Sequence, residues 1–157
     1  MTKTIPTGYH TVTPSFTFKD SLKAIEFYKK AFSAEVLNVA PAPGGRGTMH
    51  AVIQIGDSLV MMGDENPGQG CKSAETLGGS PITLFVYVPD VDMSFKQAVD
   101  AGGKSEMPVE DMFWGDRAGS IRDPFGYSWM LATHKQDLTA DQIQKGAADF
   151  FTKMAQK

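Results

Sequence analysis

Three histidines, His10, His50 and His134, are the side chains in this sequence best suited to bind a metal ion or to transfer a proton near neutral pH. Alternate residues of a strand share a face, so His50 shares a face with Gln54, and His134 shares one with Met130. His10 falls on the apolar face of its strand, which favours a structural or surface role. His50 and His134 belong to different halves of the chain and would meet at one metal ion only if the strand register brought them together.

The segment VEDMFWGDRAG, residues 109–119, combines aromatic and charged side chains. Trp114 can stack on a planar ligand, and Arg117 can donate two parallel hydrogen bonds to a carboxylate or phosphonate. We therefore expect this segment to form a loop at the rim of a site for a small anionic or planar molecule. The alternative is structural: Asp116 pairs with Arg117 or caps the turn, and the aromatic side chains cover the core.

The single cysteine, Cys71, cannot form an internal disulfide, which fits a reducing compartment, and we expect a cytoplasmic protein. Cys71 lies in a polar loop without an adjacent base, so we interpret it as an incidental thiol. The sequence contains no nucleophile elbow, Walker loop, dinucleotide-binding fingerprint or Cys-x-x-Cys pair. Whether the protein is an enzyme therefore stays open at this level.

The composition limits the classes of protein to which the chain can belong. Its 157 residues, 41% of them hydrophobic, suffice for one compact unit, so we treat residues 1–157 as a single domain. The 15 Lys and Arg residues are outnumbered by 18 Asp and Glu residues and form no basic cluster, which argues against a nucleic-acid partner. No segment approaches the roughly 20 apolar residues that cross a bilayer, so we expect no membrane partner.

A faint internal repeat at a separation of 70 positions organises the chain. In each half an alternating strand pattern, residues 11–18 and 81–88, leads to an aspartate that can cap a following helix. The helices are predicted over 21–32 and 91–101, and each is followed by a second strand, a glycine-rich excursion and a two-stranded hairpin. Each half therefore reads β-α-β-β-β, and the predicted fold class is α+β.

The first module spans about residues 8–62 and the second about 81–134, and a Gly- and Pro-rich connector over 63–80 joins them. A C-terminal helix is predicted over 139–155, because Thr139 and the glutamine three positions later form a capping-box pattern before an amphipathic stretch. Its apolar stripe consists of Ile143, Ala147, Phe150, Phe151 and Met154. The stripe packs either on its own chain or across a dimer, and we expect a homodimer.

Strand alternation also selects side chains for the inner faces of the two predicted sheets. In the first module this face carries hydroxyl side chains such as that of Thr13. In the second module it carries the aromatic residues Phe85 and Tyr87. Hydroxyls opposite aromatic rings are typical of a mostly apolar pocket with a few orienting polar groups, although an ordinary packed interior gives the same pattern. The full set of predicted ligand-binding residues is Thr13, His50, Gln54, Phe85, Tyr87, Trp114, Arg117, Arg122 and Met130.

Several phrases of the sequence are distinctive: GYHTVTP, AIEFYKKAF, LGGSP, FWGDR and DPFGYSWMLATH. Together with the two β-α-β-β-β modules, they resemble the vicinal oxygen chelate superfamily, which includes glyoxalase I, bleomycin-resistance proteins and extradiol dioxygenases, and more narrowly its PhnB-like branch. The resemblance covers about residues 8–134. It implies two mixed four-stranded sheets that curl around a cup holding a metal ion or a small molecule.

For the metal-dependent members, the resemblance implies His, Glu or Gln ligands at four strand positions. These positions fall here on Thr13, Val60, Thr83 and Met130. Valine has no donor atom, and a thioether suits soft copper rather than magnesium, nickel or zinc. We therefore predict no metal ion and no other cofactor.

The resemblance and the residues together predict a glyoxalase-like protein that binds a small anionic or aromatic molecule in its cup without a metal. One alternative is a metal-dependent lyase, isomerase or dioxygenase with ligands at unusual positions such as His50 and Glu110. Another is an antibiotic-sequestering protein with binding grooves at a dimer interface. A methyltransferase is rejected, because the chain lacks the doubly wound sheet and glycine-rich first turn that a methyl donor normally needs.

Overall fold

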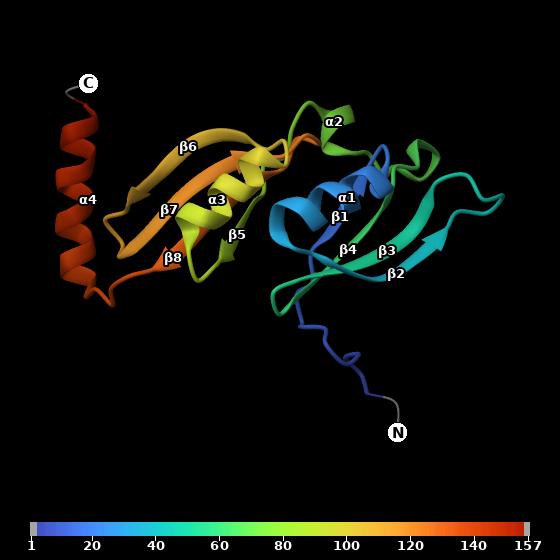
Figure 1. Cartoon of the computed structure of the whole chain (residues 1–157), viewed down its shortest axis with the longest axis horizontal. Coiled ribbons are helices and arrows are strands. Elements are labelled where there is room, and N and C mark those ends of the chain that lie inside the picture. The colour runs from blue at the N-terminus through green and yellow to red at the C-terminus, as the bar shows by residue number, and fades with distance from the viewer. Residues whose placement is uncertain (1–2, 156–157) are drawn as a thin grey trace.

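The computed structural model describes residues 3–155 and contains two successive β-α-β-β-β modules (Figure 1). The first module consists of β1 (Ser15–Phe18), α1 (Ser21–Phe32), β2 (Glu35–Pro41), β3 (Thr48–Ile55) and β4 (Ser58–Asp64). The connector holds the 3₁₀ helix η1 (Pro67–Gln69) and the short helix α2 (Ala74–Leu77). The second module consists of β5 (Thr83–Tyr87), α3 (Val91–Asp100), β6 (Lys104–Asp111), β7 (Asp116–Arg122) and β8 (Ser128–His134), and α4 (Ala140–Met154) follows it.

Each module forms its own four-stranded mixed sheet, in the orders β1-β4-β3-β2 and β5-β8-β7-β6. The first strand of each module pairs in parallel with the last, β1 with β4 and β5 with β8, whereas the other pairs are antiparallel. The predicted α+β fold of two tandem modules is confirmed. Helices α1 and α3 each cover one face of a sheet and pack against one another at the centre of the molecule (Figure 1). We call the covered face of each sheet the helix face and the opposite one the open face.

The two predicted helix starts are capped as expected. The side chain of Asp20 accepts a hydrogen bond from the backbone N–H of Lys23, and that of Asp90 accepts one from the N–H of Met93. These caps satisfy donors that the first helical turn leaves free. Each helix then buries one side against its sheet, and Tyr28 of α1 is completely shielded from solvent.

A buried carboxylate, Asp123, joins the two modules. It is 4% exposed and accepts hydrogen bonds from Tyr28 Oη of the first module at 2.6 Å and from Trp129 Nε1 of the second at 2.9 Å. The backbone N–H groups of Phe125 and Tyr127 donate to its other oxygen. Burial raises the pKa of the Asp123 carboxyl in spite of these donors. The distinctive turn that contains Asp123 therefore has a structural role, because it holds the second module against the first.

Strand β4 is shifted by one residue relative to β8, which corrects one position derived from the sequence. Val60 lies in the hydrophobic core on the helix face, and Met61 takes the open-face position that Met130 holds in β8. The cause is the length of the two hairpin turns. Residues 56–57 form the short turn of the first hairpin, whereas residues 123–127 form the longer turn of the second.

Helix α4 stands at the outer end of the second sheet and contacts the β6–β7 turn through Phe113 (Figure 1). The capping box predicted at Thr139 is present. Gly146 lies against Phe113, and Phe150 packs on the same ring with centroids 5.6 Å apart. Phe151 stays 60% exposed, so the apolar stripe is only partly covered by the rest of the protein. Neither α4 nor any other helix within residues 3–155 combines the length and apolar character needed to cross a membrane.

Candidate small-molecule binding site

A cleft of about 600 Å³ lies between the two modules. Its walls come from the segment before β1, the C-terminal end of α1, the β3–β4 turn and strand β5. Phe85 and Tyr87 of β5 line the cleft, remain 47% and 62% exposed, and have ring centroids 5.8 Å apart. Because β5 is the edge strand of the second sheet, the two rings lie where the cleft meets the open face of that sheet.

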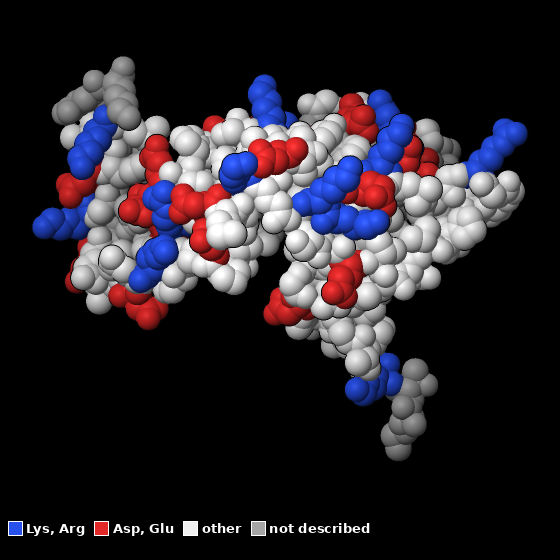
Figure 2. Space-filling model, in the orientation of Figure 1, with Lys and Arg blue, Asp and Glu red and all other residues white. Residues whose placement is uncertain are grey.

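The cleft carries few charged groups. Among residues 3–155, no lysine or arginine lines it, and Asp57 in the β3–β4 turn is the one carboxylate that does. Asp57 accepts a hydrogen bond from Ser58 Oγ at 3.0 Å, and Thr13 donates one to the backbone carbonyl of His10 at 3.1 Å. Over the face drawn in Figure 2, by contrast, acidic and basic side chains are interspersed. A mostly apolar cavity with a few polar groups is typical of small-molecule sites.

Tyr87 connects the cleft to a polar cluster around Asp116 on the open face of the second sheet. Asp116 begins β7, is 3% exposed, and accepts hydrogen bonds from Tyr87 Oη at 3.0 Å and from Trp114 Nε1 at 2.9 Å. His134 Nδ1 lies 2.7 Å from the other oxygen of Asp116, because the two residues are paired across β7 and β8. The second ring nitrogen of His134 lies 3.1 Å from Asp137.

Burial and hydrogen bonding have opposite effects on the Asp116 carboxyl. Burial disfavours its ionised form, but the donors from His134, Tyr87 and Trp114 outweigh burial and hold the pKa of this carboxyl below its ordinary value. The hydrogen bond to Asp116 raises the pKa of Tyr87. Hydrogen bonds to Asp116 and then to Asp137 raise the pKa of His134. The cluster is therefore an ionised carboxylate held by three donors, one of which is an imidazole biased toward its protonated form.

An apolar patch lies beside this cluster on the same face. Met130 belongs to it and is paired with Phe85 across β8 and β5, so the patch continues toward the cleft. Methionine side chains are flexible and make favourable contacts with aromatic rings. The residues of the patch are Met107, Met112, Trp114, Ala118, Met130 and Ala132.

Arg117, which was expected beside Trp114 at the rim of the site, lies on the helix face. Its Nε and Nη2 atoms each donate to Asp92 at 2.8 Å, and its Nη1 donates to Asp111 at 3.2 Å. Neighbouring residues of a strand point to opposite faces, so Arg117 is turned away from Asp116, to which Trp114 is bonded. The segment is also not a loop throughout, because β7 begins at Asp116. The structure therefore does not bring Arg117 and Trp114 together.

The remaining predicted residues lie on the open faces of the two sheets. Arg122 of β7 donates from Nε to Glu106 at 2.7 Å. His50 and Gln54 belong to β3, where Gln54 Nε2 donates to the carbonyl of Gly56 at 2.8 Å. The predicted set is thus divided among four places. Thr13, Phe85 and Tyr87 line the cleft, Trp114, Arg122 and Met130 lie on the open face of the second sheet, His50 and Gln54 lie on that of the first, and Arg117 lies on the helix face.

Sequence reasoning missed two features of the site, the contact between Asp116 and His134 and the position of Asp57 in the wall of the cleft. A signal for the first was available. Counting outward from the turn between residues 122 and 128 places Asp116 opposite His134 in an antiparallel hairpin. Asp57 lines the cleft only because the second module packs beside its turn, and no local pattern indicates that contact.

The residues at the strand positions where the resemblance implies metal ligands do not fit a hard divalent cation. With the register of β4 corrected, they are Met61, Thr83 and Met130 within strands, and Thr13 just before β1 begins at Ser15. Thioethers are poor ligands for magnesium, nickel or zinc, and two neutral threonine hydroxyls supply no negative charge to offset that of the cation. The alternative ligands His50 and Glu110 lie on different sheets, in β3 and β6. Within residues 3–155, no group of three or more His, Cys, Asp or Glu side chains is placed to hold a metal ion.

This fold and site define a member of a known superfamily. Residues 10–131 match the model of the Glyoxalase/Bleomycin resistance protein/Dioxygenase superfamily, and the chain belongs to that superfamily. A Mycobacterium bovis protein is 38% identical to this chain over 136 residues, which cover 85% of this chain and 89% of that protein. The family predicted from the sequence is therefore confirmed.

Two solved structures show the same fold. TioX from Micromonospora sp. ML1 superposes with a TM-score of 0.64 at 25% sequence identity, covering 80% of this chain and 98% of TioX. A PhnB protein from Bacillus cereus superposes with a TM-score of 0.61 at 17% identity, covering 79% of this chain and 99% of that protein. The predicted likeness to PhnB-like proteins is thus confirmed at the level of the fold.

Proposed function

We propose that this protein binds a small organic molecule in the cleft between its two modules, against Phe85 and Tyr87 and without a metal ion. The observation that carries the proposal is the pair of adjacent, half-exposed rings in a cavity of about 600 Å³. A cavity of that volume suits a drug-sized or smaller molecule. Large aromatic side chains gain free energy when they are covered, so a planar ligand stacked on both rings would be stabilised by burial.

Membership of the superfamily supports a binding role, since its description includes resistance proteins as well as enzymes. We do not assign a reaction, because the residues at the expected metal positions are threonines and methionines. We further propose that the binding form is a cytoplasmic homodimer. Exposed apolar side chains of β2, such as Val36, Leu37 and Val39, offer surface that a second copy would cover.

The test uses 2-naphthol, a two-ring aromatic probe that is uncharged near neutral pH, in isothermal titration calorimetry with EDTA-treated protein. We expect saturable binding that EDTA treatment leaves unchanged. Replacing both rings, Phe85→Ala with Tyr87→Ala, should weaken binding about tenfold or more, because each ring contact contributes roughly 0.5–1.5 kcal/mol beyond its buried area. Phe151→Ala, which removes a similarly exposed ring outside the cleft, is the matched control and should leave binding unchanged.

Two results would overturn the proposal. The first is an affinity that the double variant leaves unchanged, or the absence of saturable binding to the unmodified protein. The second is binding that disappears after EDTA treatment and returns with added metal, which would favour the metal-dependent alternative. Thermal unfolding of each variant shows that a change in binding does not come from loss of the fold.

A further inference from the structure

We infer that the ligand of the inter-module cleft is a planar aromatic cation. The inference rests on the proposed function and adds the charge and shape of the molecule that the cleft recognises. Four features of the cleft support it: two exposed aromatic rings, one carboxylate with no lysine or arginine from residues 3–155, a helix C-terminus in the wall, and a phenol oxygen that can only accept.

The rings of Phe85 and Tyr87 line the cleft and are about half exposed, so part of their aromatic surface is open to a ligand. Their planes are inclined by 33° with centroids 5.8 Å apart, so a flat molecule can contact both rings at once. The face of an aromatic ring carries partial negative charge and attracts a cation within about 6 Å of its centroid. A flat cation therefore gains both from stacking and from this attraction, whereas an anion of the same shape gains from stacking alone.

The charged groups of the cleft also favour a cation. Asp57 is the one carboxylate that lines it, and no lysine or arginine within residues 3–155 does so. A carboxylate at the edge of the cleft attracts a cation, and added salt weakens that attraction. Asp57 lies in an exposed turn and accepts a hydrogen bond from the neutral hydroxyl of Ser58, and no basic residue within 3–155 forms an ion pair with it.

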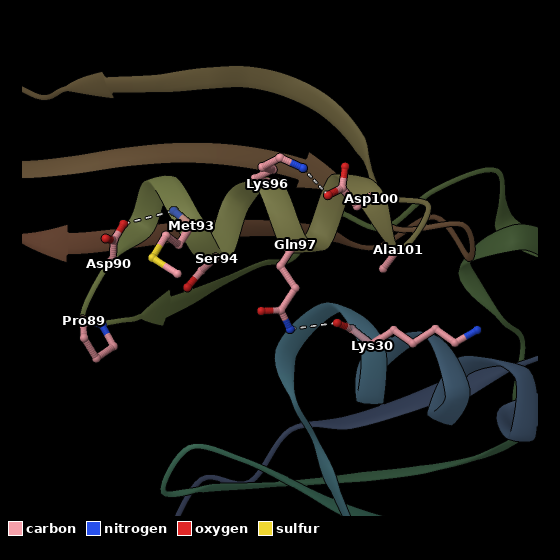
Figure 3. Close-up of a pocket in the computed structure, with 9 residues that line it drawn as sticks. All are labelled: Lys30, Pro89, Asp90, Met93, Ser94, Lys96, Gln97, Asp100 and Ala101. Carbon is pink, nitrogen blue, oxygen red and sulfur yellow. Dashed lines mark hydrogen bonds and ion pairs between the residues drawn. The ribbon is translucent and has the colours of Figure 1, made fainter.

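The wall formed by α1 is the C-terminal, negative end of that helix. Residues 31–33 line the cleft, and the last carbonyls of a helix carry roughly half an elementary negative charge. Two lysines occur in this last turn, but neither lines the cleft. Lys29 pairs with Glu26 at 2.8 Å. The side chain of Lys30 extends away from Gln97 along an adjoining groove, which shares Pro89, Ser94 and Gln97 with the cleft (Figure 3).

The phenol of Tyr87 has a fixed polarity. Its O–H donates to Asp116, so the oxygen can offer only lone pairs to a ligand. The arginines that could serve an anionic ligand are already paired, Arg117 with two aspartates and Arg122 with Glu106. Of the two ligand classes expected from the sequence, anionic or aromatic, these contacts favour the aromatic one and add a positive charge.

The experiment compares three two-ring probes of nearly equal size: the cation 1-methylquinolinium, uncharged 2-naphthol and the anion 2-naphthoate. Affinities are measured by isothermal titration calorimetry at low and high sodium chloride. We expect the cation to bind about tenfold tighter than the anion, with 2-naphthol between them. Added salt should weaken binding of the cation and leave that of 2-naphthol unchanged.

The variant Asp57→Asn removes the negative charge at the edge of the cleft and keeps a side chain of nearly the same size and shape. The substitution lies in an exposed turn, and it should weaken binding of 1-methylquinolinium several-fold while leaving 2-naphthol unaffected. Asp149→Asn removes an exposed carboxylate of α4 outside the cleft and should change neither affinity.

Equal or tighter binding of 2-naphthoate overturns the inference while the proposed function stands, because the cleft then still binds an aromatic molecule. An unchanged ratio of cation to naphthol affinity in Asp57→Asn overturns it as well. Failure of all three probes to bind refutes the proposed function and the inference together.

Discussion

The joint between the modules can be tested by removing a single hydroxyl, in the variant Tyr28→Phe. Tyr28 is 0% exposed, and its Oη donates to the buried Asp123 at 2.6 Å. Hydrogen bonds to charged groups contribute about 1.5–3 kcal/mol, and Trp129 Nε1 remains as a donor to the same oxygen, which limits the loss. We therefore expect the free energy of unfolding to fall by about 2 kcal/mol. At about 2–4 °C per kcal/mol for a chain of this size, Tm should fall by about 4–8 °C.

The assay is urea unfolding near neutral pH, followed by tryptophan fluorescence, together with a thermal scan. Tyr9→Phe removes the same hydroxyl from the segment before β1, outside the joint, and serves as the control. A loss below about 0.5 kcal/mol, or one no larger than that of the control, would show that the bond between Tyr28 and Asp123 does not stabilise the joint, because surface changes usually have effects of that size.

His134 should titrate above its ordinary pKa of 6.5, because hydrogen bonds to two carboxylates favour the imidazolium. The stability that this raised pKa adds to the folded state is present below pH 6.5 and is lost as the pH rises through the folded-state pKa. An NMR titration of His134 measures that pKa, and Asp137→Asn should lower it. An unchanged pKa in Asp137→Asn would show that the contact with Asp137 does not stabilise the imidazolium. Gly103→Ala should destabilise the protein by about 1–3 kcal/mol, since overpacking a core costs that much and an added Cβ would lie 2.8 Å from Ile121 Cδ1. Gly68→Ala, where the nearest atom is 3.4 Å away, is the control in thermal unfolding, and equal shifts would refute the steric account.

Local signals predicted the elements of this fold because they act within a few residues. The capping aspartates Asp20 and Asp90 begin the two module helices, and Thr139 begins α4, as their spacing indicated. The same local reasoning misplaced Val60, since counting from one hairpin turn to the next assumes turns of equal length. It also grouped Trp114 with Arg117, although Trp114 is bonded to Asp116 and Arg117, the next strand residue, faces the opposite way.

The cleft could not be predicted in the same way, because it depends on how the modules pack. Strand alternation places Phe85 and Tyr87 on one face of β5, but their neighbours across the cleft come from residues far away in sequence, such as Asp57. The contacts that set this packing are α1 against α3 and Tyr28 against Asp123. None of them follows from the periodicity of a single segment.

The two modules of this chain repeat the same topology but share one hydrophobic core, so neither module has a complete core of its own. Phe18 and Tyr28 of the first module and Trp129 of the second belong to one continuous cluster of buried side chains, and the partly buried Phe125 packs against it. Tyr127 bonds across the boundary as well, through its hydroxyl to the backbone of β1. Cutting the chain in the connector would expose these rings on both pieces and leave Asp123 without its tyrosine partner. The two modules therefore repeat only in topology. We expect them to fold together, and a substitution in the core of one module to affect the stability of the other.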